Sequence, residues 1–82
     1  MIKSVSPRTL YILELCSDPR GCELEELYWE LSLPPKAIRQ RIRNLISSGH
    51  LRTISPERVT ITSHGNAVMN ATQQRILAES DA

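Results

Sequence analysis

The sequence contains little of what builds a disulfide framework, a metal site or a membrane span. Cys16 and Cys22 are its two cysteines, too few for a disulfide framework, and with His50 and His64 they do not form the close ligand pairs of zinc fingers. No apolar run approaches the roughly 20 residues that span a bilayer, and the N-terminal stretch lacks the apolar core of a signal peptide. We therefore expect free thiols, no metal, no membrane partner and a cytoplasmic protein.

The signatures of catalysis are missing as well. The sequence has no glycine-rich phosphate loop and no pair of carboxylates in a credible pocket. Ser63 and His64 are neighbours in the sequence, which does not place a base against a nucleophile. With 82 residues the chain can form one small core but not a deep catalytic cavity as well. We expect a single domain over residues 1–82 that is not an enzyme, uses no cofactor and has no evident small-molecule ligand.

The charges are separated along the chain, although the formal net charge is only +1. Segment 14–30 is strongly acidic, with Arg20 as its only cation. Between Glu30 and Glu57 there is no acidic residue at all. The cations of that interval are Lys36, Arg39, Arg41, Arg43 and Arg52. This pattern predicts an electrically polar protein with one basic surface.

The basic interval contains a predicted helix over residues 34–48, which follows a turn at Leu33 and Pro34. Apolar residues at spacings of three and four predict its buried stripe, formed by Ile38, Ile42, Leu45 and Ile46. At about 100° per residue, Lys36, Gln40 and Arg43 point away from that stripe, with Arg39 on one flank. Arg and Lys can neutralise phosphates or pair with guanine, and Gln can pair with adenine. This face favours reading of a DNA major groove over a merely solvated helix.

The remaining elements can be placed from their start and stop signals. Ser6 followed by Pro7 predicts a helix to about Ser17, and the glutamates from Glu23 begin a second helix that ends near Leu31. Two short β-branched runs, 51–54 and 59–62, predict a hairpin with a four-residue loop. A final helix is expected over about 66–80. The predicted order is helix, helix, helix, hairpin, helix.

Two of these helices have apolar residues on more than one side. In the first and last helices these residues predict a homodimer interface formed by Tyr11, Leu15, Met69, Ile76 and Leu77. The alternative is that the last helix folds back on its own domain. Trp29 falls beside the stripe of the second helix, where we expect it half exposed with a packing role, or else in contact with a phosphate or a partner.

The order of elements resembles the winged helix-turn-helix regulators, particularly the MarR-type and PadR-type families. The resemblance is carried by two runs, ELEELYWELSLPPKAIRQRIRNLISSGHL and VTITSHG. It implies an α+β, mostly α fold with three helices, a two-stranded wing and a C-terminal helix that dimerises as in PadR-type proteins. It also implies recognition-helix positions for Pro35, Lys36, Arg39, Gln40 and Arg43. The wing residues implied to reach the adjacent backbone or minor groove are Arg52, Ser55 and Arg58.

Two functions are compatible with this sequence. The first is sequence-specific binding of double-stranded DNA by a small transcriptional regulator, which reads the major groove with helix 34–48 and the backbone with wing 52–61. The second is a winged-helix module for protein–protein interaction, such as an accessory subunit or adaptor that never binds DNA. The acidic segment 14–30 supports the second function, because its glutamates would be repelled by phosphate if they faced DNA.

Overall fold

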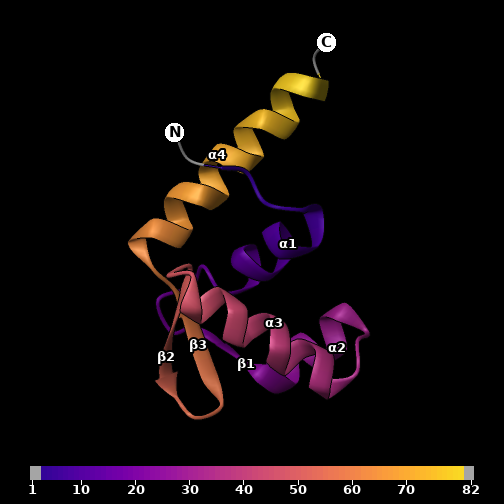
Figure 1. Ribbon diagram of the computed structural model, residues 1–82, viewed down its shortest axis with the longest axis vertical. Helices are drawn as coiled ribbons and strands as arrows, with labels where there is room; N and C mark the ends of the chain where they lie inside the picture. Colours follow the sequence, from indigo (N-terminus) through magenta and orange to yellow (C-terminus); the bar gives the residue numbers. More distant parts are fainter. Residues whose placement is uncertain (1–2, 81–82) are drawn as a thin grey trace.

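The structure is a computed structural model that describes residues 3–80. Its elements are α1 (Pro7–Leu15), β1 (Cys22–Glu23), α2 (Leu24–Leu31), α3 (Pro35–Ser47), β2 (Leu51–Ser55), β3 (Arg58–Ile61) and α4 (Ser63–Ser80). The molecule is elongated, 41 × 25 × 20 Å, because α4 extends away from the body while α2, α3 and the hairpin gather at the other end (Figure 1). This order of elements confirms the predicted α+β, mostly α winged helix-turn-helix fold.

Helices α1 and α3 begin where local signals place them. The Ser6 side chain accepts a hydrogen bond of 3.3 Å from the backbone N–H of Thr9, and Pro7 occupies the first turn of α1. Pro34 precedes α3 without a side-chain cap, as its chemistry requires, and Pro35 starts the helix. Gly49 follows α3 at φ 82°, a conformation that glycine adopts readily, and turns the chain into β2.

The sheet has three antiparallel strands in the order β1–β3–β2. Strand β1 pairs with β3 through Cys22 opposite Val59 and Glu23 opposite Arg58. Glu23 was expected in the second helix, and β1 was not predicted, because two residues carry no recognisable strand pattern. The hairpin turns at Pro56 and Glu57, two residues instead of the predicted four, with an irregular register near its tip.

The hydrophobic core draws on every helix and every strand. Its buried apolar residues are Leu10, Ile12, Leu13, Cys16, Cys22, Leu24, Leu27, Ile38, Ile42, Leu51, Val59, Val68 and Met69. Each fully buried aliphatic side chain contributes about 1.5–3 kcal/mol to folding. The predicted stripe of α3 is confirmed at Ile38 and Ile42, whereas Leu45 is half-buried and Ile46 is 38% exposed. Ile46 lies at the edge of α3 that faces the hairpin, where two short strands do not cover it completely.

Helix α4 begins at Ser63, three residues earlier than the range expected from sequence. The Thr62 hydroxyl accepts a hydrogen bond of 2.9 Å from the N–H of Gly65 and so caps the new helix. A Cβ at Gly65 would collide with the carbonyl oxygen of His50, so this position requires glycine for close packing rather than for a turn. The expected range left residues 63–65 outside the helix, because the composition of Ser-His-Gly does not distinguish a turn from a helix start.

Helix α4 packs on the body of the protein as far as Gln73, whose Nε2 donates a hydrogen bond of 3.0 Å to Oε2 of Glu14 in α1. Val68, Met69 and Thr72 are buried against α1, and the N–H of Val5 donates to the Thr72 hydroxyl at 3.1 Å. Ile76 is 41% exposed and Leu77 is 64% exposed. No helix within residues 3–80 is long and apolar enough to cross a membrane.

Candidate nucleic-acid interface

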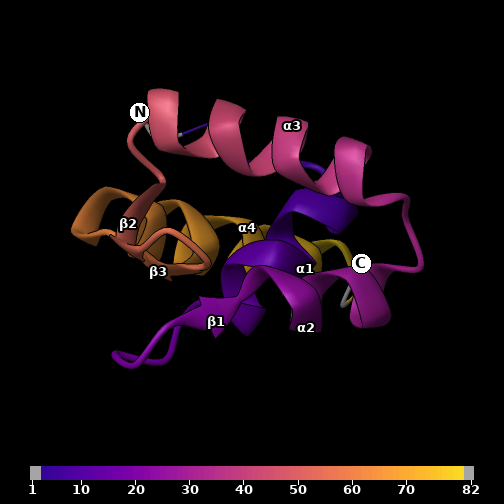
Figure 2. The ribbon, with the colours of Figure 1, turned by 90° about the horizontal axis from the view of Figure 1, so that it is seen from below.

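Helix α3 lies along one edge of the molecule, and the rest of the chain packs on one side of it (Figure 2). Its other side therefore faces solvent. The five residues of this helix that the resemblance assigned to DNA recognition are all exposed and line a single surface hollow. They are Pro35, Lys36, Arg39, Gln40 and Arg43. We call this surface the α3 face. The predicted residues are thus brought together, and three of them are cations with no carboxylate among them.

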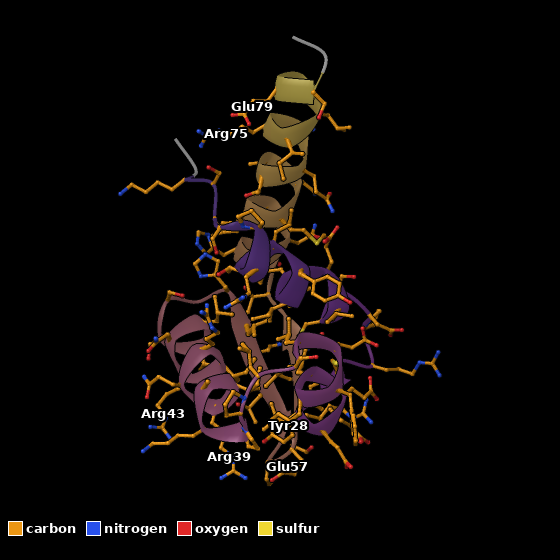
Figure 3. All side chains as sticks on the ribbon, turned by 90° about the vertical axis from the view of Figure 1, so that its right-hand side faces the viewer. Tyr28, Arg39, Arg43, Glu57, Arg75 and Glu79 are labelled. Atoms are coloured by element: carbon orange, nitrogen blue, oxygen red, sulfur yellow. The ribbon has the colours of Figure 1, made fainter. Side chains whose placement is uncertain are left out.

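The guanidinium groups of Arg39 and Arg43 project from the same end of the molecule (Figure 3). Arg39 is held by α2, because its Nε donates a hydrogen bond of 3.3 Å to the Tyr28 hydroxyl. This hydrogen bond raises the pKa of Arg39 above its ordinary value. The side chain is therefore a permanent cation whose two terminal amino groups remain available for an acceptor such as a phosphate or a guanine edge.

Gln40 is also ordered on the surface of α3. Its Nε2 donates a hydrogen bond of 3.1 Å to Oδ1 of Asn44, one turn further along the helix. The pair places two amide groups side by side next to the cations. Amide side chains can bind the N6 and N7 edge of adenine, while the neighbouring guanidiniums bind guanine or phosphate. The α3 face therefore has the chemical groups for reading both kinds of base pair.

The wing contributes to this region in a different way from the one expected. Arg52 and Ser55 are exposed on β2, as a DNA contact would require. Arg58 is not free: its Nη2 lies 2.7 Å from Oε1 of Glu23, and its Nη1 donates to the carbonyl of Arg20 at 3.1 Å. Its side chain is 33% exposed. The structure thus corrects the picture of Arg58 as a wing-tip cation, since its guanidinium holds β3 to the segment before β1.

Glu57, which was not among the predicted site residues, lies at the wing tip. Glu57 lines a groove between α3 and the hairpin together with Arg39, Arg43, Ile42 and Ile46, among others. Its negative charge contributes to raising the pKa of Arg39. Figure 3 shows Glu57 at the same end of the molecule as both arginines. A carboxylate here opposes phosphate on the wing side of α3, so the α3 face carries the favourable potential and the wing tip does not.

The carboxylates of α2 make their contacts away from the α3 face. Glu30 accepts a hydrogen bond of 2.7 Å from the Tyr11 hydroxyl of α1. Glu26 lies 3.5 Å from the Cys22 thiol. Glu23, in β1 just before the helix, pairs with Arg58. The acidic and basic surfaces predicted from the charge pattern are therefore separate surfaces on the folded chain.

The five residues predicted to form a dimer interface have different environments. Met69 belongs to the core of its own chain, and Leu15 is half-buried against that core. The prediction is wrong for Met69, because α4 turns that side toward α1. Tyr11 is partly exposed, and Ile76 and Leu77 line a shallow hollow between α1 and α4. The packing of α4 on α1 as far as Gln73 agrees with the alternative of a helix folded on its own domain.

Both cysteines are free and buried, as the sequence analysis expected. Burial raises the pKa of Cys16 to about 12 and that of Cys22 to about 11, so both are neutral thiols at physiological pH. No group of three or more His, Cys, Asp and Glu side chains within residues 3–80 is arranged to hold a metal ion. Burial lowers the pKa of His50, whose ring lies 4.9 Å from that of His64.

Comparison with known proteins places this fold. No protein-family model and no curated protein matches the sequence. The crystal structure of a MarR family protein from Mycobacterium tuberculosis is similar with a TM-score of 0.63 and 24% sequence identity, over 92% of this chain and 62% of that one.

A crystal structure of the same protein in complex with p-aminosalicylic acid gives a TM-score of 0.60 and 26% identity, over 92% of this chain and 66% of that one. The chain therefore spans less than two thirds of the length of the proteins it resembles. The backbone arrangement, from α1 through the helix-turn-helix pair and the wing to α4, is a winged helix-turn-helix fold of the kind found in MarR family structures.

Proposed function

We propose that this protein binds double-stranded DNA sequence-specifically and acts as a small transcriptional regulator, with residues 1–82 forming one winged helix-turn-helix domain. Helix α3 would lie in the major groove, and Arg52 and Ser55 of β2 would contact the neighbouring backbone. The observation that carries the proposal is the α3 face. Its three cations and one amide are exposed together with no carboxylate among them. Such a surface matches both the charge of a phosphate backbone and the edges of bases.

The separation of charges supports the same proposal. A helix enters a major groove favourably when the elements beside it place no carboxylate next to a DNA phosphate, because the two negative charges repel each other. Glu30 of α2 contacts α1, Glu26 of α2 contacts β1, and Glu23 of β1 contacts β3 instead. Arg58 is left out of the proposed interface, because its guanidinium is already engaged. The protein would thus bind DNA mainly through α3, with a minor contribution from β2.

The proposal includes a homodimer. A single winged domain contacts few base pairs, and specific sites are often bound by two copies placed about one helical turn apart. Support comes from the second half of α4, where Ile76 and Leu77 are exposed on a helix that extends from the body. The dimer surface we propose is therefore limited to Tyr11, Ile76 and Leu77.

Two further parts of the sequence-based prediction bear on this proposal. Because a DNA-binding protein must reach DNA, the proposal includes a cytoplasmic location. The expectation of no small-molecule ligand is withdrawn, because the M. tuberculosis protein with a similar fold has a structure with p-aminosalicylic acid.

The test is selection of bound sequences from a random duplex library, followed by gel-shift titration of the enriched site. Gln40→Ala should cost about 1–3 kcal/mol on that site and relax the preference at one base pair. Arg75→Gln is the matched control, because Arg75 lies on α4 at the opposite end of the molecule from Arg39 and Arg43 (Figure 3). Failure to recover any enriched duplex would favour the alternative, a winged-helix module for protein contacts.

A further inference from the structure

Trp29 is the most exposed large apolar residue of the described chain. It is 80% exposed, on the outer surface of α2. The half-exposed packing role predicted from sequence is therefore wrong. Single exposed aliphatic residues are common on protein surfaces and need no explanation. A tryptophan is different, because it is the residue most enriched at the centres of binding interfaces.

The surroundings of Trp29 follow from the geometry of α2. Leu24 and Leu27 are buried, and Tyr28 is half-buried and reaches across to α3. At about 100° per residue, Trp29 lies on the side of α2 opposite the buried stripe. Residues three and four positions earlier in a helix are its surface neighbours, so Glu26 and Glu25 flank the indole. We call the surface formed by Glu25, Glu26, Trp29 and Glu30 the α2 face.

The α2 face has no cation of its own. No lysine or arginine occurs between Arg20 and Lys36. Among residues 3–80, no ion pair involves Glu25, Glu26 or Glu30. Glu30 accepts its hydrogen bond from the neutral Tyr11 hydroxyl, and Glu26 is near the neutral Cys22 thiol. The carboxylates of Glu25 and Glu26 therefore flank an exposed indole, and no cation pairs with them or with Glu30.

This combination of groups selects a particular kind of partner. The face of an indole is the best aromatic partner for a guanidinium or an ammonium group, and the neighbouring carboxylates attract the same cations. Phosphate groups are repelled, which excludes DNA and anionic lipid from this surface. We propose that the α2 face docks a cationic segment of another protein, with an arginine or lysine side chain over Trp29 and further cations paired with the glutamates.

The two faces can be occupied together. None of the residues of the α2 face lines the hollow of α3 or the groove between α3 and the hairpin. A basic protein segment could therefore dock while α3 is bound to DNA, and the inference holds whether or not the proposed DNA binding is correct. A second copy of this chain would have to offer its α3 face, which would make docking and DNA binding mutually exclusive.

Trp29 is the only tryptophan in the chain, so fluorescence excited selectively at tryptophan reports on this residue alone. The experiment selects peptides of about 12 residues from a random display library on the intact protein, with depletion on Trp29→Ala. The enriched peptides are then titrated against the protein while emission is recorded. We expect them to be rich in arginine and lysine, to shift the emission of Trp29 and to weaken with salt.

The variants give the proposal its controls. Trp29 is exposed, so Trp29→Ala should keep the unfolding midpoint while peptide affinity falls about tenfold or more. Neutralising Glu25 and Glu26 to glutamine should weaken binding several-fold. Glu14→Gln with Glu79→Gln, which removes two charges elsewhere, should leave affinity within about twofold.

Three results would each overturn the inference. The first is a selection that enriches acidic or purely apolar peptides, or that enriches no peptide. The second is equal peptide affinity in Trp29→Ala. The third is a shift of the Trp29 emission in the absence of peptide. If duplex DNA caused the shift, the α2 face would bind DNA, and if a higher protein concentration caused it, the α2 face would bind a second copy. Loss of DNA binding with intact peptide binding would instead refute only the proposed function.

Discussion

Arg58 gives the sharpest contrast between a contact inferred from sequence and one made in the fold. Its guanidinium joins β3 to Glu23 at 2.7 Å and donates to the backbone carbonyl of Arg20 at 3.1 Å. An ion pair exposed to this degree is worth about 0.5–1 kcal/mol, and a hydrogen bond from a charged donor to a carbonyl adds about 1 kcal/mol. Arg58→Ala should therefore lower the free energy of unfolding by about 1–2 kcal/mol.

Urea denaturation followed by far-ultraviolet circular dichroism measures this change. For a domain of this size, a loss of 1 kcal/mol lowers the melting temperature by about 4–8 °C. Arg52→Ala is the matched control on the same hairpin, and because Arg52 is exposed it should change stability by less than about 0.5 kcal/mol. The double variant with Glu23→Ala should be less destabilised than the sum of the single variants. Unchanged midpoints for both Arg58→Ala and Glu23→Ala would refute the tether.

Three other predictions concern the core, a close contact and the proposed interface. Met69→Ala should lower the free energy of unfolding by about 2–5 kcal/mol, as measured by urea denaturation. Leu77→Ala should lower it by less than about 0.5 kcal/mol but should weaken the dimer, as measured by sedimentation. Gly65→Ala should destabilise by more than 1 kcal/mol, because the new Cβ meets the His50 carbonyl; an unchanged melting temperature would contradict that contact. Tyr28→Phe should lower DNA affinity about threefold through Arg39 without changing the salt slope, and should have no effect in an Arg39→Ala background.

Patterns that are local in the sequence predicted much of the fold. Helix α3 was placed within one residue at each end, because Ile38 and Ile42 recur at helical spacing and Pro35 and Gly49 mark its two limits. The hairpin was found from its β-branched runs. The residues of the α3 face are exposed as a group, as expected: the directions of Lys36, Arg39, Gln40 and Arg43 follow from the buried stripe, and Pro35 was added by the family resemblance.

Features that depend on partners distant in sequence were missed. Strand β1 exists only because Cys22 meets Val59, a pairing that no pattern within two residues reveals. The pairing of Arg58 with Glu23 joins residues 35 positions apart, so Arg58 was left free in the prediction. Met69 and Ile76 both looked suited to an interface, and only the packing of α4 on α1 separates them. The exposure of Trp29 was predicted wrongly, because the residue was placed beside the buried stripe of α2 and it lies on the opposite side of the helix.

The central claim is that the α3 face binds DNA, and the salt dependence of binding tests it most directly. The measurement is the equilibrium constant for the enriched duplex across a series of salt concentrations, for the intact protein, Arg43→Ala and Arg75→Gln. We predict a steep linear fall of log K with log salt, a slope smaller by about 0.9 for each phosphate contact that Arg43 makes, and no change for Arg75→Gln. Binding that does not depend on salt, or an equal loss in Arg43→Ala and Arg75→Gln, would contradict the account.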